Sequence, residues 1–358
     1  MRDLEQIVLP YLSNPFIPLP EELRKIFAFV NWHRLINMAD ENKVSFPLLQ
    51  RVISSKAHMS AKLNNELQVA FDNRKRMLKK WIESLEEVML ILEKNGIDAV
   101  LIKSLKGFDN PSMDLDLLVK NNFEAFQAAR ILQKLDYQCH TADDNRKVSC
   151  KAKGPSDKID VDIYTKIGWR NVDINLVDHE KIWRRKRLVR FHELKVPVPS
   201  VEDDILINCA HSLFGHHQYF LCDLFYLVDA FKKKLQIDYM FKISKKFGWS
   251  IGLFSFLNYS NYLYKKFFGK QIFEEDLLLR FREQVAFSTS KIGRVNLKEI
   301  RFPFRCPISW DFYIWIEKSF LQNAKSRLRL KENGILATDN IRMLVSSICD
   351  SLSKHVKG

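Results

Sequence analysis

The spacing of hydrophobic residues predicts helices at the start of the chain. After the proline-rich stretch NPFIPLP, apolar residues recur at helical spacing from Leu23 to Val30. A longer apolar stripe follows in alternating three- and four-residue steps, broken only by Arg74, and Asn95-Gly96 ends it as a left-handed cap would. Its members are Leu67, Phe71, Leu78, Trp81, Leu85, Val88 and Leu92. We therefore interpret residues 1–95 as a helical region.

The pattern changes to strand type in the middle of the chain. Short apolar or alternating runs occupy 99–103, 113–120, 137–140, 147–153 and 159–164. Between the second and third of these runs, residues 121–135 are typical of a helix that is capped by asparagine. Its inward face is expected to hold Phe123, Phe126, Ala129 and Leu132. The order of elements is helix, strand, strand, helix and then a cluster of strands.

From about residue 201 the pattern is helical again. The segment VEDDILINCAHSLFG begins with acidic residues, which suit a helix N-terminus, and FLCDLFYLVDAFKKKL continues in the same style. Further helical runs lie around 253–267 and 310–332, separated by the breaker RFPFRCP at 301–307. We predict an α+β protein with a small mixed sheet and helical flanks. The expected domains are 1–95, 96–200 and 201–358.

Composition agrees with a folded chain that carries an excess of positive charge. Among 358 residues, 46% are hydrophobic and 26 are Phe, which a disordered chain lacks. Lys and Arg number 57 against 43 Asp and Glu, a formal net charge of +14. Such an excess attracts RNA, nucleotides or other polyanions, although lysine also serves solubility alone.

The cysteines and the apolar runs predict a cytoplasmic protein without membrane contact. The six cysteines show no regular spacing, so free thiols in a reducing compartment are expected. The first residues contain acidic side chains where a signal peptide needs an apolar run. The most apolar stretch, YFLCDLFYLVDAF, is interrupted by Asp223 and Asp229.

The segment LIKSLKGFDNPSMDLDLLV contains the candidate chemistry. Asp114 and Asp116 are two residues apart in a predicted strand, so both carboxylates lie on one face. Their mutual repulsion is relieved by a cation, and Mg²⁺ prefers carboxylate and phosphate oxygens. A solvated strand edge is the alternative for this common pattern. The apolar LLV that follows and a second strand with Asp160 and Asp162 favour the metal platform.

These residues resemble the DNA polymerase β-like nucleotidyltransferase superfamily, and within it a poorly characterised group. The quoted matches are LIKS, DLDLLV and VDIYTKI, followed by the His-containing INCAHSLFGHHQYFLCDLFYLVDAF. They cover residues 95–232. Lys103-Ser104 stands where the superfamily has Gly-Gly or Gly-Ser, and Tyr164 replaces a histidine of the group.

The resemblance implies a transfer of a nucleoside monophosphate from an NTP to a hydroxyl group. It assigns Asp114, Asp116 and Asp162 to Mg²⁺ or Mn²⁺ and to catalysis, with Asp160 as a rival of Asp162. Lys103, Ser104 and Lys106 are the expected nucleotide-binding residues. The acceptor is left open between RNA, a protein side chain and a small molecule.

Two further clusters are weighed against simpler interpretations. His211, His216 and His217 suggest zinc, but their spacing shares no helical face, which favours packed or surface histidines. The basic stretch KIWRRKRLVR (181–190) is either a contact for phosphates or RNA, or a solvated linker.

Two other classes of function stay open beside the enzyme. One is a non-catalytic nucleotide- or RNA-binding protein on a degenerate core. The other is a basic helical scaffold for nucleic acid, in which the aspartates are incidental.

Overall fold

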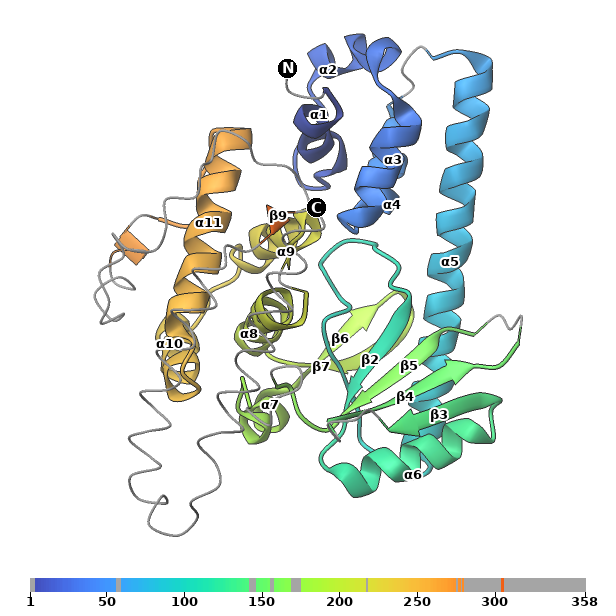
Figure 1. The fold of residues 1–358 in the computed structure, drawn as a ribbon, viewed down its shortest axis with the longest axis vertical. Coiled ribbons are helices and arrows are strands. Elements are labelled where there is room, and N and C mark those ends of the chain that lie inside the picture. The colour runs from blue at the N-terminus through green and yellow to red at the C-terminus, as the bar shows by residue number, and fades with distance from the viewer. Residues whose placement is uncertain are drawn as a thin grey trace, which may run out of the picture.

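The described chain combines a five-stranded mixed sheet with two groups of helices (Figure 1). The computed structural model describes residues 4–279, apart from gaps at 56–58, 142–145, 155–157, 169–174, 217, 275 and 278, together with 304–305. The predicted α+β class is confirmed. The helical run predicted at 310–332 lies outside the described residues, as does the breaker at 301–307 except for 304–305.

The elements follow one another in three stretches. Before the sheet come α1 (Leu4–Ser13), α2 (Glu21–Lys25), the 3-10 turn η1 (Phe27–Phe29), α3 (Trp32–Glu41), α4 (Ser45–Ser54) and α5 (Ala61–Lys94). The sheet is built from β1 (Val100–Leu101), β2 (Asp114–Leu118), β3 (Tyr137–Thr141), β4 (Lys147–Ala152) and β5 (Asp160–Tyr164), with α6 (Asn122–Gln133) inserted after β2. After it come α7 (His179–Arg185), β6 (Arg187–Phe191), β7 (Leu194–Val198), α8 (Val201–Ala210), the π-helix η2 (His211–His216), β8 (Gln218–Tyr219), α9 (Leu221–Ala230), α10 (Ile237–Lys246), α11 (Ser250–Phe268) and β9 (Phe304–Arg305).

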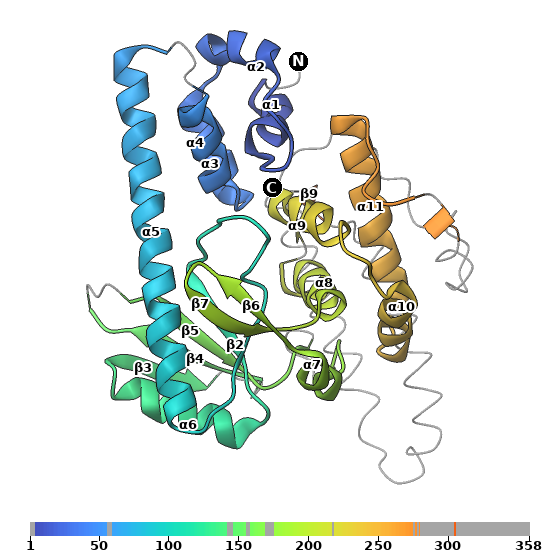
Figure 2. The same cartoon turned by 180° about the vertical axis from the view of Figure 1, so that it is seen from behind.

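The long helix α5 runs from the N-terminal helices to the sheet, and both views show this course (Figures 1 and 2). Six of the seven residues of its predicted stripe are buried, and the seventh, Phe71, is partly buried. Arg74, which breaks the stripe, donates to the Ser45 hydroxyl at the start of α4. Gly96 has φ +74° after the Asn95 cap, as predicted.

The strand order β1-β2-β5-β4-β3 places the two aspartate-bearing strands side by side. Strands β2 and β5 pair in parallel, whereas the other neighbours in the sheet are antiparallel. The register sets Asp114 opposite Asp160 and Asp116 opposite Asp162. Side chains alternate along a strand, so all four aspartates start from the same face of the sheet.

The two faces of the sheet belong to different hydrophobic cores. Leu115 and Leu117 of β2 are buried with residues of α5 and α6. On the other face, Leu118 joins a second core, which is shared by helices from before and after the sheet. The aspartates therefore lie on the face toward this helical core. Asp114 and Asp116 are at the start of β2, ahead of its buried apolar residues Leu117 and Leu118.

Helix α6 buries Ala129 and Leu132, as predicted, but not the two predicted phenylalanines. Phe123 and Phe126 are 69% and 48% exposed, so their predicted inward position is wrong. The buried positions of α6 are Ala125, Ala128, Ala129 and Leu132. Small alanines let the helix approach the sheet closely, and that packing outweighs the area that two phenylalanines would bury.

Two other expectations need correction. Cys139 and Cys150 lie directly opposite each other on β3 and β4 and form a disulfide, so the expectation of free thiols is wrong for this pair. Cys209 and Cys222 are free and buried. Residues 187–198 form the β6–β7 hairpin, which the sequence analysis missed. Among the described residues, no helix has the length and apolarity that a membrane span requires.

Candidate metal and nucleotide site

The structure brings Asp114, Asp116 and Asp162 together. One potential ligand atom from each carboxylate lies within 4.8 Å of the others. Within the described ranges, this is the only group of three or more His, Cys, Asp or Glu side chains with such spacing. The Ser112 hydroxyl donates to Asp114 at 2.9 Å, and the Trp81 indole donates to the Asp114 carbonyl at 3.1 Å. Hydrogen bonds thus hold both the carboxylate and the backbone carbonyl of Asp114.

Asp160, the rival of Asp162, lies outside the group although it starts from the same face. Its carboxylate accepts the Ala152 N–H at 3.0 Å, on the neighbouring strand β4. This hydrogen bond links the end of β4 to the start of β5, so the Asp160 carboxylate has a structural partner. Asp162 faces the other two aspartates, so the structure separates two carboxylates that the sequence pattern alone left equivalent.

Lys103 supplies a cation to the triad from the loop after β1. Its ammonium lies 2.7 Å from Asp116 and 3.1 Å from the Tyr164 hydroxyl. The backbone of Lys103 has φ +64°, the left-handed region that favours glycine. This is the position where the resemblance expects glycine, so the chain keeps the glycine-like backbone and adds a charged side chain that points to Asp116.

Lys147 and Ser149 hold Asp162 from strand β4. The Lys147 ammonium forms an ion pair with one carboxylate oxygen, and the Ser149 hydroxyl donates to the other at 2.6 Å. The β4–β5 register places Ser149 opposite Asp162. Sequence reasoning missed both residues. Their signal was present in KVSCKAK, where Lys147 and Ser149 alternate onto the face that carries the aspartates.

The triad has three carboxylates and two lysine partners, and nearby acidic groups have raised pKa values. Burial raises the pKa of Asp114 above its ordinary value, the charge of Asp116 raises it further, and the Ser112 hydrogen bond and Lys103 only partly oppose this. Burial and the charges of Asp116 and Asp162 raise the pKa of the Tyr164 phenol well above its ordinary value. Tyr164 therefore stays protonated beside the aspartates. A divalent cation would relieve the remaining repulsion, and three carboxylates are hard oxygen donors that suit Mg²⁺ or Mn²⁺.

The other two predicted nucleotide-binding residues are placed differently from Lys103. The Ser104 hydroxyl donates to the Ile102 carbonyl at 3.0 Å. Lys106 is buried, contacts the Asn208 side chain through a hydrogen bond, and lies over the Tyr226 ring at 4.9 Å. Burial raises the pKa of Asp204, and the positive charge of Lys106 partly opposes that rise. Lys106 thus faces the helical core, while Lys103 faces the triad.

The histidines pack against each other. The rings of His211 and His216 meet edge to face with centroids 4.4 Å apart, and His217 lies outside the described residues. Burial and then the charge of Lys103 lower the pKa of His211 well below its ordinary value, so this imidazole is neutral. A Cβ on Gly215 would meet the His211 ring at 3.0 Å, so a larger residue there would require this ring to shift.

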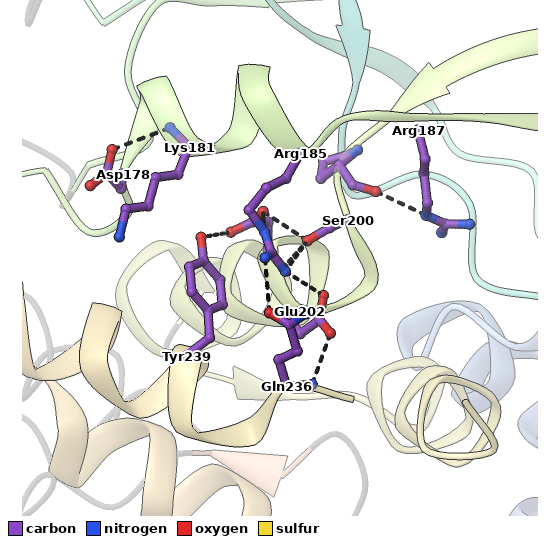
Figure 3. Close-up of polar contacts among 10 residues, drawn as sticks. Asp178, Lys181, Arg185, Arg187, Ser200, Glu202, Gln236 and Tyr239 are labelled. Atoms are coloured by element: carbon purple, nitrogen blue, oxygen red, sulfur yellow. Dashed lines mark hydrogen bonds and ion pairs between the residues drawn. The ribbon is translucent and has the colours of Figure 1, made fainter. Parts of the chain in front are cut away.

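The basic stretch 181–190 serves intramolecular contacts at its middle. Figure 3 shows Arg185 in a polar network that joins α7 to α8 and to Gln236, the residue before α10. Its guanidinium pairs with Glu202 at 2.8 Å and Asp203 at 3.2 Å, and it lies over the Tyr239 ring at 4.0 Å. Within the same stretch, the side chains of Arg184 and Arg190 are 78% and 72% exposed.

Comparisons with known proteins agree with the predicted family. A family model described as "uncharacterised nucleotidyltransferase" matches residues 29–269. The predicted resemblance is thereby confirmed, and the match extends beyond residues 95–232 into the flanking helices. Among solved structures, the chain is similar to MenT4, a nucleotidyltransferase toxin from Mycobacterium tuberculosis H37Rv, with 11% identity, a TM-score of 0.28 and coverage of 85% of this chain and 98% of that chain. So low a TM-score adds nothing to the family match. Among curated proteins, none matches.

Proposed function

The chain belongs to this family of uncharacterised nucleotidyltransferases, and we propose on that premise that it moves a nucleoside monophosphate from an NTP to a hydroxyl group. The observation that carries the proposal is the convergence of Asp114, Asp116 and Asp162 on the polar end of two parallel strands. Asp114 and Asp116 occupy β2, and Asp162 comes from β5 in register with Asp116.

The three carboxylates are the residues that would hold the metal. When bound, Mg²⁺ or Mn²⁺ supplies positive charge to the phosphate oxygens and to the attacking oxygen. Lys103 and Lys147 supply positive charge to Asp116 and Asp162 from within the chain. Lysine ammonium groups are flexible point charges, so they can turn toward a phosphate when a stronger cation takes their place.

The reaction balances with the groups present. The acceptor hydroxyl oxygen forms a bond to the α-phosphorus, and the bond from that phosphorus to the bridging oxygen breaks, so pyrophosphate leaves with the electron pair. Asp162 accepts the hydroxyl proton and passes it to water. Lys147 and Ser149 keep this carboxylate oriented toward the other two aspartates. Lys103 neutralises phosphate charge from the opposite side of the triad.

We propose RNA as the acceptor, because the net charge of +14 favours polyanions. The exposed Arg184 and Arg190 are the residues of the basic stretch that suit this contact. RNA affinity should fall steeply with salt, and replacing both arginines by Ala should lower the slope by about one or two units. Filter binding across a salt series measures that slope. Arg185 is unsuitable for this test because it pairs with Glu202 and Asp203, so its replacement would also disturb the fold.

The decisive experiment follows the label from an NTP. The protein is incubated with Mg²⁺ or Mn²⁺ and each α-phosphate-labelled NTP in the presence of cellular RNA, cellular protein or small metabolites. Label in RNA supports the full proposal, and label in protein or a metabolite retains the transfer but replaces the acceptor. The double variant Asp114→Asn, Asp116→Asn should transfer no label. Asp160→Asn is the matched control, since that aspartate lies on the same face outside the triad.

A non-catalytic nucleotide-binding protein is the second candidate. The observation that favours it is the pairing of two of the three carboxylates with lysines. This candidate predicts NTP binding without transfer to any fraction, with every metal tested. The same labelling experiment therefore separates it from the enzyme.

A further inference from the structure

A cavity of about 420 Å³ lies beside the triad, on the other side of Lys103. Its walls are the loop after β1, the β6–β7 hairpin, the first turn of α8 and the last turn of α9. Asp114, Asp116 and Asp162 do not line it. Its size lies in the range of small-molecule sites. Lys103 lines this cavity and contacts Asp116 at 2.7 Å, so the two places share one cation.

Two of the three acidic residues that line the cavity, Asp204 and Asp229, are already held by partners. Asp204 accepts the Tyr226 hydroxyl at 2.6 Å, and burial raises its pKa despite the charge of Lys106, which reduces its negative charge. Asp109 lies 3.4 Å from the His192 imidazole. Asp229 pairs with Lys232 and more loosely with Lys233, at 3.5 and 3.7 Å. Asp204 and Asp229 therefore leave little negative charge to repel an anion, whereas the charge of Asp109 is offset only when the His192 imidazole is protonated.

Arg187 is the cation of the cavity with donors to spare. Its Nε donates to the Pro199 carbonyl at 3.1 Å, and Figure 3 shows its guanidinium apart from the Arg185 network. Within the described part of the chain, its terminal nitrogens form no hydrogen bond, although its charge acts on the buried Asp204. A guanidinium with a free edge matches the paired oxygens of a phosphate. Lys233 adds a second, loosely paired cation from the end of α9.

The loop that forms one wall has a fixed shape. Gly107 has φ +76°, and a Cβ there would meet Asp229 Oδ2 at 2.2 Å. The loop therefore packs directly on α9, and only glycine allows this contact. Lys106 anchors the same loop to α8 through Asn208. A cavity wall that is set in advance loses little conformational entropy when a ligand binds.

We propose that this cavity binds a phosphate-bearing group, held by Arg187 and Lys233 and shared through Lys103 with the triad. Two sources offer this chemistry: the phosphate chain of the NTP, or a phosphate of the acceptor. The choice between these sources rests on the proposed nucleotidyl transfer. Phosphate binding in the cavity does not, because it needs neither the metal nor the aspartates.

The test titrates pyrophosphate, and separately a nucleoside 5′-monophosphate, into metal-free protein at low salt by calorimetry. The wild type should bind at least one of them. Arg187→Ala and Lys233→Ala should each weaken that binding by about tenfold, the usual effect of removing one charged hydrogen bond. Lys234→Ala is the matched control, since it removes the same charge one residue away from Lys233 and outside the cavity. Arg187→Lys should restore part of the affinity.

Thermal melts show that each variant is folded, and the exposed Lys233 tests the idea even if the Arg187 variant unfolds. Failure of the wild type to bind either probe would overturn the proposal, as would cavity variants that bind as well as the control. Binding should persist in the Asp114→Asn, Asp116→Asn variant. Loss of transfer together with retained phosphate binding would therefore remove the proposed function and leave the cavity site intact.

Two further arms identify the source of the phosphate. If Arg187→Ala weakens NTP binding in the presence of Mg²⁺, and pyrophosphate competes with the NTP, the cavity holds the phosphate chain. If NTP binding is unchanged while the 5′-monophosphate loses affinity, the cavity holds a phosphate of the acceptor. Either result supports a phosphate site.

Discussion

The aspartate triad and the Arg185 network are built from the same kinds of residues but are balanced in opposite ways. In the triad, three carboxylates share two lysines, and the pKa of Asp114 is raised. Around Arg185, one guanidinium meets Glu202 and Asp203, and hydroxyl, amide and aromatic groups complete its contacts. There, hydrogen bonds from the amide N–H groups of Gln236 and of Glu202 itself, the Ser200 hydroxyl and the charge of Arg185 overcome burial and lower the pKa of Glu202.

The difference distinguishes a candidate ligand-binding site from a network that only stabilises the fold. A network in which each charged group has an opposite charge or several hydrogen bonds stabilises one arrangement, and it has little charge left to offer a ligand. A cluster with excess negative charge costs stability until a cation arrives, and such clusters are found at functional sites. The contrast also shows that a basic residue in a charged stretch is assigned to nucleic acid only after its contacts are known, since Arg185 pairs within the protein whereas Arg184 and Arg190 are exposed.

The largest expected effect is on activity at the triad. Asp114→Asn with Asp116→Asn should lower nucleotidyl transfer by about 1,000-fold or more, since several kcal/mol of charge stabilisation are lost. Thermal stability without metal should be equal or higher for Asp114→Asn alone, because it removes a repulsive charge and leaves the Lys103–Asp116 ion pair intact. Initial rates and metal-free melts measure the two quantities. A marked loss of stability with little change in rate would make the pair structural and erase the contrast.

The next effect is on stability at the other cluster. Arg185→Ala leaves Glu202 and Asp203 buried without their cation, so the free energy of unfolding should fall by roughly 3 kcal/mol. Arg184→Ala is the control, since its exposed pair with Glu180 should contribute about 0.5 kcal/mol at most. Urea titrations of the two variants give the comparison. Equal losses would mean that the network around Arg185 adds no stability.

Local patterns in the sequence predicted the strands of the five-stranded sheet, the long helix and the shared face of the aspartates on each strand, and the choice of Asp162 over Asp160 came from the family resemblance. Alternation in DLDLLV and IDVDIY determines which side chains share a face, and the apolar residues between them determine which face is buried. The stripe of α5 is equally local, since every step follows the helical period. The convergence of Asp162 with the β2 pair needed one further fact, the parallel pairing of β2 with β5.

Contacts between distant residues were beyond such patterns. Arg185 meets Gln236, which lies 51 residues further along the chain, and no spacing rule links the two. The hairpin 187–198 has alternating residues on both sides of His192-Glu193, a local strand signal that overlaps the basic stretch 181–190. For α6, periodicity allowed two faces, and the choice of the alanine face depends on the close approach of the sheet.

A smaller effect should appear at the residues that orient Asp162. Ser149→Ala removes the 2.6 Å hydrogen bond to Asp162 and should lower metal affinity by about tenfold, as expected for a partner of a metal ligand. The metal concentration that gives half-maximal transfer should rise, while the rate at saturating metal changes little. Ser54→Ala on α4, an exposed serine bonded only to its own helix, is the control. An unchanged metal dependence would leave Ser149 a structural residue of the β4–β5 pair.

The smallest effect is a difference in pH response between the two clusters. The pKa of Asp114 in the folded protein lies above its ordinary value of 3.8, so the unfolded chain releases this proton first. Without metal, stability is therefore lost as pH rises above 3.8 and through the folded pKa, and Asp114→Asn should not show this loss. Glu202 behaves in the opposite way, because its folded pKa lies below its ordinary value of 4.5. Its contribution is complete above pH 4.5 and is lost as pH falls below it, so Glu202→Gln should differ from the wild type most at neutral pH and least in acid.

Urea unfolding from pH 3 to 8 in the presence of EDTA tests both changes in one series. The stability of Asp114→Asn relative to the wild type should rise with pH and then level off, whereas that of Glu202→Gln should fall with pH and then level off. Adding Mn²⁺ should reduce the advantage of Asp114→Asn, because the wild type gains a bound cation that the variant holds poorly. If the relative stability of both variants falls with pH, the charges of the triad, like those of the Arg185 network, are already compensated without metal.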